Sequence, residues 1–533
     1  MNKNRRIRKM SATMENKSST KNGVKRLVFV VIAILLEVLI NVALVIFLGV
    51  YQEWIMILLH IAAAALVLYI YNEDKTASIK MPWIILVMAM PVLGLTLYLL
   101  VGLNPGMSSM RKRYEEIDKD LLPLMPDKRS DIDELSKKDK RAGNIARYIL
   151  DRSSYPTYKD TDIVYFAEAT DGIETQKKEL KKAQKFIFME YHAIENAESW
   201  KAIEDVLVDR VKAGVEVRVF YDDMGSIGFI NTDFVKLLES KGIRCRVFNP
   251  FKIGLNLFLN NRDHRKITVI DGKVGFTGGY NIANEYFNIT HPFGYWKDTG
   301  IMVRGEVVKS LTVAFLEMWN AIRGDDENDT DYKQYLPDVE NVEEISPEYN
   351  WSKGFVSPYA DIPLDKEQTG EEVYISIAEY AKTYAWYITP YLILTDEMVH
   401  ALGLAAKRGV DVRVITPGIP DKALVYSITR SYYHSLVRNG VKIYEYTPGF
   451  CHCKMSIADD MLATCGTINM DYRSLYHHFE NGCLYADCQA VLDTKADFES
   501  MFKESREVTQ DYLEPTAGKK LLQMILRLAA PLM

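Results

Sequence analysis

The chain has 533 residues and a mass of 61.0 kDa, which is too long for one hydrophobic core and predicts two or three domains. Hydrophobic residues make up 48% of it and charged residues 26%, which excludes a wholly disordered protein. Residues 1–26 carry nine Lys/Arg and one Glu, a net charge of +8; since the whole chain is −6, residues 27–533 sum to −14. An acidic body argues against broad nucleic-acid binding, which needs cations against the phosphates.

Three apolar stretches follow the basic tail, over residues 27–50, 54–71 and 82–103. A helix of about 20 apolar residues crosses the hydrocarbon of a bilayer. We therefore expect transmembrane helices within residues 27–103, with the basic tail on the cytoplasmic side. Prolines interrupt the third stretch and the second is short, so the number of crossings stays open, as does the membrane face that carries the body.

The rest of the chain alternates predicted strands and helices, and this pattern occurs twice. The strings AGVEVRV at residues 213–219 and RGVDVRV at residues 408–414 nearly coincide. Because strand–helix–strand units pair their strands in parallel, we expect two similar α/β units, each a mixed or parallel sheet flanked by helices. The predicted organisation is a basic tail (1–26), a hydrophobic membrane region (27–103), a charged helical connector (104–150), a first α/β unit (151–322), an acidic linker (323–372) and a second α/β unit with a C-terminal amphipathic helix (373–533).

Each unit contains the same four chemically useful residue types at the same spacing. Lys follows His by two positions, Asp follows it by seven and Asn by seventeen. The two sets are His264, Lys266, Asp271 and Asn281, and His452, Lys454, Asp459 and Asn469. A single His-x-Lys pair is more often a solvated strand face, but two copies with matched offsets favour a site.

The His-x-Lys spacing places both side chains on one face of a strand, because residues i and i+2 of a strand point the same way. The Asp that follows is typical of a turn. Two imidazoles, two ammonium groups and two amides suit a phosphodiester: one imidazole attacks phosphorus, the other protonates the leaving alkoxide, and the remaining groups stabilise the charged oxygens. No cluster at metal-ligand spacing is evident, so we expect neither a metal nor another cofactor.

Longer strings around these motifs carry a family resemblance. They are HRKITVIDG at residues 264–272, FTGGYNIANEY at 276–286 and GTINMDYRS at 466–474. The chain resembles the phospholipase D superfamily, whose HxKxxxxD motif occurs twice per active site, and more closely the bacterial cardiolipin synthases. The resemblance covers roughly residues 54–533. It implies two phospholipase D-type units with the active site between them, in a multi-pass protein of the cell membrane.

The resemblance also implies a reaction and the roles of residues. Two phosphatidylglycerol molecules exchange a phosphatidyl group through a covalent phosphatidyl-histidine, giving cardiolipin and glycerol without a cofactor. His264 would be the nucleophile and His452 the acid and then the base, although the two sets alone do not distinguish these roles. The lysines and aspartates of the two motifs would complete the catalytic set: Lys266, Asp271, Lys454 and Asp459. The family places a carboxylate behind each histidine: Asp298, 34 residues after His264, and Glu480, 28 residues after His452.

Other functions stay open at the level of sequence. A phospholipase D-type hydrolase or another phosphatidyltransferase would use the same groups with a different acceptor, and a membrane scaffold on a decayed fold is the non-enzymatic alternative. The expected partners are phosphatidylglycerol and membrane lipids, not nucleic acid, and the oligomeric state is not indicated. Histidines without a counterpart in the other unit, His192 and His478 among them, favour surface or loop positions.

Overall fold

The computed structural model describes residues 53–102, 105–231, 233–250, 261–322, 328–338 and 349–514, and a few isolated positions elsewhere. The basic tail, the predicted segment 27–50 and most of the C-terminal residues 519–533 therefore lie outside the described residues. One described residue of the last segment, Arg527, donates to Ser435 Oγ at 2.5 Å and lies over the Tyr432 ring. This contact favours docking of that segment on the body.

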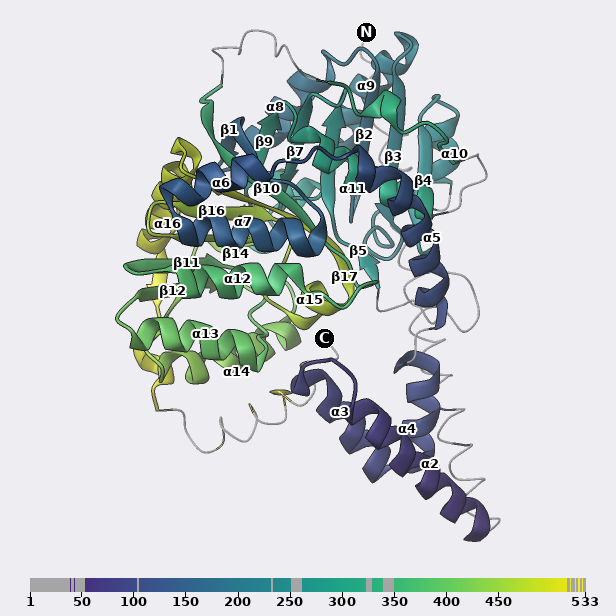
Figure 1. The fold of residues 1–533 in the computed structure, drawn as a ribbon, viewed down its shortest axis with the longest axis vertical. Coiled ribbons are helices and arrows are strands. Elements are labelled where there is room, and N and C mark those ends of the chain that lie inside the picture. Colours follow the sequence, from purple (N-terminus) through teal and green to yellow (C-terminus); the bar gives the residue numbers. More distant parts are fainter. Residues whose placement is uncertain are drawn as a thin grey trace, which may run out of the picture.

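The described chain begins with a helical projection, α2 (Glu53–Tyr71), α3 (Ala77–Ala89), α4 (Pro91–Leu97) and the π-helical turn η1 (Tyr98–Gly102). Figure 1 shows these helices extending away from the α/β body. The predicted stretch 82–103 is divided because the chain breaks at Met90 and Pro91 starts a new helix. In the described part of the chain, no helix is both long enough and apolar enough to cross a membrane, so the expected transmembrane helices are not confirmed.

The charged connector is helical, as predicted, and forms α5 (Pro105–Leu121), α6 (Arg129–Lys138) and α7 (Lys140–Ser153). The side chain of Asp139 caps α7 by accepting hydrogen bonds from the backbone N–H groups of Arg141 and Ala142. One face of α7 is apolar and buried. The connector therefore packs on the body and covers part of its core.

Both halves contribute to one large sheet with short strands beside it. The strands of the first half are β1 (Tyr158–Phe166), β2 (Phe186–Tyr191), β3 (Glu216–Asp222), β4 (Arg244–Phe248), β5 (Arg262–Asp263), β6 (Lys266–Ile270), β7 (Val274–Gly278), β8 (Tyr295–Lys297) and β9 (Gly300–Arg304). Those of the second half are β10 (Ser352–Asp361), β11 (Tyr384–Ile388), β12 (Asp411–Pro417), β13 (Lys442–Tyr446), β14 (Gly449–Cys451), β15 (Met455–Ala458), β16 (Leu462–Gly466), β17 (His478–Ala486) and β18 (Ser505–Glu507).

The two halves repeat one strand order. It runs β1-β9-β7-β6-β2-β3-β4 in the first half and β10-β17-β16-β15-β11-β12-β13 in the second, with β18 added at the edge. Strands β2, β3 and β4 are parallel, whereas β2 and β6 are antiparallel, so each half is a mixed sheet. Antiparallel pairing of β1 with β10 joins the halves into a continuous sheet. The predicted mixed α/β fold with an internal repeat is confirmed.

Helices cover both faces of this sheet (Figure 1). They are α8 (Ala169–Leu180), α9 (Glu198–Lys212), α10 (Phe234–Glu239), α11 (Val308–Ala321), α12 (Thr369–Tyr380), α13 (Asp396–Lys407), α14 (Ala423–Val437), α15 (Tyr472–Tyr476) and α16 (Gln489–Lys503). Strand β2 shows the alternation: Phe186 and Phe188 belong to one apolar cluster, Ile187 and Met189 to another. Both faces are apolar because both are covered.

One predicted segment has a different structure. Within the acidic linker expected over residues 323–372, residues 352–361 form β10, which lies in the middle of the sheet between β1 and β17. Its charged surroundings and Pro358 hide this strand in the sequence, since proline is rare in central strands. This part of the link is therefore a central strand of the sheet rather than a surface excursion.

Candidate active site

Two short strand pairs run between the halves and position the His-x-Lys motifs. Strand β5 pairs in parallel with β17, and β8 pairs in parallel with β14. The backbone N–H of His264 donates to the Phe479 carbonyl at 2.9 Å, and that of His452 donates to the Lys297 carbonyl at 2.7 Å. Each histidine backbone is thus fixed to the residue that precedes the carboxylate of the opposite half.

Each histidine consequently pairs with a carboxylate from the other half of the chain. His264 Nδ1 lies 2.9 Å from both carboxylate oxygens of Glu480, and His452 Nδ1 lies 2.7 Å from Asp298 Oδ2. The resemblance had implied the right acids, but our expectation that each serves the histidine of its own half is wrong. The physical reason is that the cross-half strand pairs bring β8 to one motif and β17 to the other.

These contacts define which nitrogen of each imidazole is free. A carboxylate only accepts, so Nδ1 carries the proton and Nε2 keeps its lone pair. Both acids are fully buried and are held in turn: Thr467 Oγ1 donates to Glu480 Oε2 at 2.5 Å, and the Thr299 N–H donates to Asp298 Oδ1 at 2.9 Å. Burial raises the pKa of Asp298 to about 7, a rise that the Lys454 ammonium opposes.

The two lysines of the motifs are buried beside the histidines. Lys266 Nζ donates to the His264 carbonyl at 2.6 Å, and Lys454 Nζ lies 2.8 Å from His452 Nδ1 and 3.0 Å from its Nε2. Burial lowers the pKa of Lys266 to about 7 and that of Lys454 to about 8. An anion placed between them would restore their charge, because it compensates for the lost solvation.

Both imidazoles are neutral in this arrangement. Burial lowers the pKa of His264 and of His452 well below the usual range, and the nearest lysine of each motif adds to the effect. A neutral imidazole with a free Nε2 is a nucleophile or a base. The site therefore holds two groups of that kind, and the charges of both motif lysines act on each of them.

The two asparagines differ in their contacts. Asn281 accepts from the Ala193 N–H at 3.1 Å and donates to Tyr286 OH at 2.9 Å, so much of its amide is engaged. The Oδ1 of Asn469 is buried and has no hydrogen-bond partner among the described residues.

The structure does not bring Asp271 and Asp459 to the histidines. Asp271 accepts from the backbone N–H groups of residues 184–186, and Asp459 from those of residues 382–384, at 2.7–2.9 Å. Asp271 lies beyond the far end of β6, about 16 Å along the strand from Lys266 at roughly 3.3 Å per residue. Both carboxylates fix the start of a neighbouring strand, and both residues have positive φ in the predicted turns.

Two histidines that the sequence analysis assigned to surface or loop positions flank His264. The His192 ring lies 4.8 Å and the His478 ring 5.5 Å from the His264 ring, centre to centre. His478 Nδ1 is 3.5 Å from Glu480 Oε1. Within the described chain, His264, His478 and Glu480 are the one group of His, Cys, Asp and Glu side chains that could hold a metal ion. Neither histidine has a partner in the repeat, so the sequence offered no signal.

Aromatic side chains surround His452. The rings of Tyr286, Trp296 and Phe450 lie 5.3, 5.4 and 5.9 Å from the imidazole. Tyr391 extends this aromatic wall, with its ring 6.3 Å from that of Phe450. The surroundings of the two histidines therefore differ: polar around His264 and aromatic around His452.

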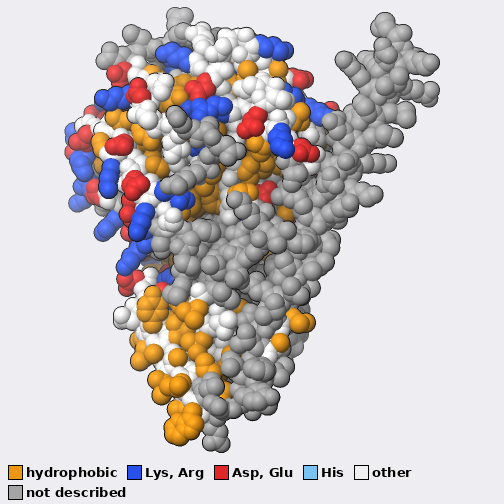
Figure 2. All heavy atoms as spheres, turned by 90° about the vertical axis from the view of Figure 1, so that its right-hand side faces the viewer, with side chains coloured by type: hydrophobic (Ala, Val, Ile, Leu, Met, Phe, Trp, Pro, Cys, Tyr) orange, Lys and Arg blue, Asp and Glu red, His pale blue; other side chains and the backbone are white. Residues whose placement is uncertain are grey.

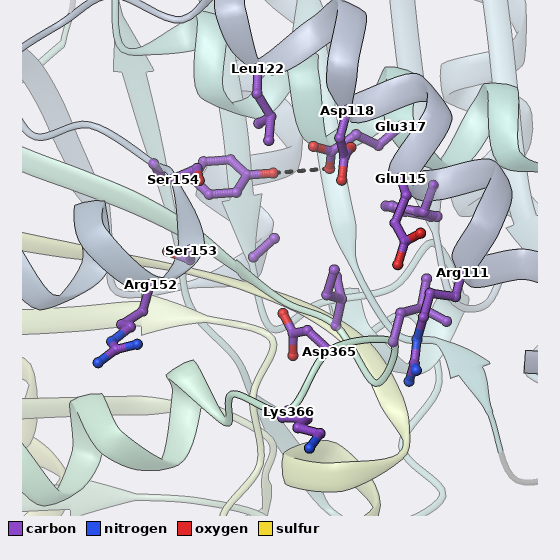
Figure 3. Close-up of a pocket in the computed structure, with 15 residues that line it drawn as sticks. Arg111, Glu115, Asp118, Leu122, Arg152, Ser153, Ser154, Glu317, Asp365 and Lys366 are labelled. Carbon is purple, nitrogen blue, oxygen red and sulfur yellow. Dashed lines mark hydrogen bonds between the residues drawn. The ribbon is translucent and has the colours of Figure 1, made fainter. Parts of the chain in front are cut away.

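A cavity of about 430 Å³ is lined by residues of α5, α11 and the chain after β10, among them Asp118 and Glu317. Figure 3 shows these two carboxylates next to one another. The Tyr155 hydroxyl donates to Glu317 Oε2 at 3.1 Å. Burial, and then Asp118, raise the pKa of Glu317 to about 8. Arg265 turns toward this side of β6 and donates to the Ala314 carbonyl of α11 at 2.9 Å. The cavity is thus separate from the paired histidines.

Comparison with known proteins identifies the family of this chain. Residues 177–319 and 374–502 match the family described as cardiolipin synthase, PLD-like domain. An uncharacterized protein of Streptococcus mutans is 41% identical over 88% of this chain and 99% of its own length. The cardiolipin synthase of Alkalihalophilus pseudofirmus is 31% identical over 91% of this chain and 96% of its own. The major cardiolipin synthase of Bacillus subtilis is 29% identical over 88% of this chain and 96% of its own length.

A solved structure supports the fold independently of sequence. The phosphatidylserine synthase of Haemophilus influenzae superposes with a TM-score of 0.55 at 15% identity, covering 74% of this chain and all of that one. At such low identity the likeness concerns the fold alone. Taken with the family match over both halves, the chain belongs to the cardiolipin synthase family of phospholipase D-like enzymes.

Proposed function

We propose that the protein is a cardiolipin synthase that transfers a phosphatidyl group from one phosphatidylglycerol to another and releases glycerol. The observation that carries this proposal is the exchanged pair of buried His–carboxylate contacts, one on each side of a shared site. Membership of the cardiolipin synthase family supports the choice of substrate. The net reaction replaces one phosphodiester by another, so it needs no oxidant and no nucleotide.

In the first step His264 Nε2 attacks the phosphorus of the donor lipid. A P–N bond forms, the P–O bond to glycerol breaks, and His452 supplies the proton that the leaving oxygen takes. The negative charge of the bound phosphodiester raises the pKa of His452, so His452 takes up this proton when the substrate binds. Lys266 and Lys454 bind the non-bridging oxygens.

In the second step the acceptor lipid reverses this path. Its hydroxyl gives a proton to His452, its oxygen forms a P–O bond, and the P–N bond to His264 breaks. Glu480 and Asp298 hold the two imidazoles in the tautomer with Nε2 free. We take His264 as the nucleophile and His452 as the group that exchanges protons, which are the roles that the family resemblance implies. Asp271 and Asp459 act as positioning residues for the strands that carry the site.

We further propose that the N-terminal helical projection attaches the enzyme to a bilayer. Trp54 is 76% exposed and Tyr71 72% exposed, and many apolar side chains between them are also exposed. Figure 2 shows hydrophobic side chains gathered over this projection. Exposed apolar patches of this kind mark protein or membrane contacts. Full-length protein that stays in the supernatant when phosphatidylglycerol vesicles are pelleted would contradict the attachment.

The reaction is tested with purified protein in detergent–phosphatidylglycerol micelles that contain excess EDTA. Lipid products are followed by mass spectrometry and glycerol by an enzymatic assay. Cardiolipin and glycerol in equal amounts are expected. Phosphatidate with glycerol would show a hydrolase, and activity that depends on added metal would contradict the metal-independent mechanism.

A further inference from the structure

Lys422 lies at the outer edge of the aromatic wall around His452. It sits between β12 and α14, with Nζ 5.3 Å from the centre of the Tyr391 ring and 3.5 Å from the Tyr391 hydroxyl. The Tyr391 hydroxyl donates to Asp421 Oδ2 at 2.5 Å, which fixes the ring. Contacts from Tyr391 to Phe450 and from Phe450 to His452 continue this line into the site.

The ammonium of Lys422 is accessible to a ligand. Its side chain is 65% exposed, and its ion pair with Asp421 is long at 3.7 Å. After burial and the motif lysines, Lys422 is among the charges that lower the pKa of both His264 and His452. Its charge therefore acts at the reaction centre without being part of it.

The reaction requires a second anion site on this side. The donor phosphate lies between the two motif lysines, and the leaving and attacking oxygens both exchange protons with His452. The acceptor phosphatidylglycerol carries its own phosphate, three carbons from the attacking hydroxyl. We place that phosphate beyond His452, along the aromatic wall, where Lys422 lies.

The carboxylates near Lys422 make this lysine necessary for binding a phosphate here. Glu285 and Asp421 lie within electrostatic reach of one another and of Lys422, and burial, followed by Glu195, raises the pKa of Glu285 to about 7. A phosphate would be repelled by these carboxylates unless a specific cation held it. We propose that Lys422, seated on Tyr391, binds the phosphate of the acceptor phosphatidylglycerol and so selects an anionic lipid as acceptor. This inference rests on the proposed function and names its acceptor subsite.

The test is a competition between two acceptors for one intermediate. Full-length enzyme is given phosphatidylglycerol micelles with 1-butanol, and the ratio of cardiolipin to phosphatidylbutanol is measured. Both products arise from the same phosphatidyl-enzyme, so the ratio reports the acceptor step and is independent of the first step. Lys422→Met should lower the ratio about tenfold, the effect expected for losing one partly exposed charge-assisted contact. Lys422→Arg should keep most of it.

The control is Lys407→Met, which removes an exposed lysine at the end of α13 and should leave the ratio unchanged. An unchanged ratio in Lys422→Met would overturn the proposal, whether or not total turnover falls. A ratio that falls equally in Lys407→Met would show a general charge effect and would overturn it too. Wild-type enzyme that makes phosphatidylbutanol but no cardiolipin would refute the proposed function instead.

Discussion

Glu480 and Asp298 each determine which nitrogen of an imidazole can react. Glu480→Gln removes the charge and lets an amide N–H face His264 Nδ1, which favours the tautomer with Nε2 protonated. We expect kcat to fall by on the order of 10²–10⁴, as when the carboxylate of a catalytic triad becomes an amide. Circular dichroism should be unchanged. Glu499→Gln, an exposed change on α16, is the control; a Glu480→Gln enzyme with wild-type kcat would refute the role given to the acid.

The lowered pKa values of the motif lysines predict a pH dependence. The lysines are cationic below pKa values of about 7 for Lys266 and about 8 for Lys454, and they lose this charge as pH rises through them. Since kcat/KM reports ionisations of the free enzyme, it should fall between pH 7 and 9. Initial rates at subsaturating phosphatidylglycerol measure it. A value that stays constant up to pH 9.5 would contradict the assignment.

Gly279 is required by the close approach of Asp298. A Cβ at residue 279 would lie 2.0 Å from Asp298 Oδ1, so an added methyl group must displace the carboxylate that orients His452. We expect Gly279→Ala to lose at least about tenfold in kcat and 1–3 kcal/mol in stability, as overpacked sites do. Gly228→Ala adds a methyl group where nothing lies within 4 Å and is the matched control. Equal activity of the two variants would show that Asp298 tolerates displacement.

At the scale of elements, strands with strong local patterns could be predicted and contacts between halves could not. The repeated strings at residues 213–219 and 408–414 run into β3 and β12, so the repeat located both strands. The His-x-Lys pairs were expected inside strands, yet β6 begins at Lys266 and β15 after Lys454. The exchange of Asp298 and Glu480 depends on the long-range pairing of β5 with β17 and of β8 with β14, which no local pattern encodes.

Packing of α5 against α11 carries a titratable carboxylate pair, Asp118 and Glu317. The pKa of Glu317 is raised in the folded protein to about 8, so its contribution to stability is present at low pH and is lost as pH rises through about 8. The glutamine side chain in the Glu317→Gln variant is neutral at every pH. We expect this variant to melt about 3 °C above wild type at pH 9 and close to wild type at pH 5, measured by differential scanning fluorimetry. A variant that is less stable than wild type at both pH values would contradict this account.

At the scale of the whole molecule, the two halves form one active site because neither is complete alone. Each half supplies a histidine and the carboxylate for the histidine of the other half, and β1 and β10 hold the halves in one sheet. The internal repeat was evident in the sequence. The paired histidines and lysines were evident as well, but Asp271 and Asp459 were also expected in the site and instead hold neighbouring strands. His192 and His478 lack repeat partners and are placed beside His264 only by the fold.

The central claim is that this shared site forms a covalent bond from His264 to the phosphatidyl group. The most direct test quenches turning-over enzyme with denaturant at mildly alkaline pH, where phosphohistidine survives and the acyl esters of the lipid stay intact, and locates the adduct by proteolysis and mass spectrometry. We expect the phosphatidyl mass on the peptide that contains His264, and its loss in His264→Asn. An adduct on the peptide that contains His452 would reverse the roles of the two histidines, and cardiolipin formed with no adduct on either peptide would contradict the account.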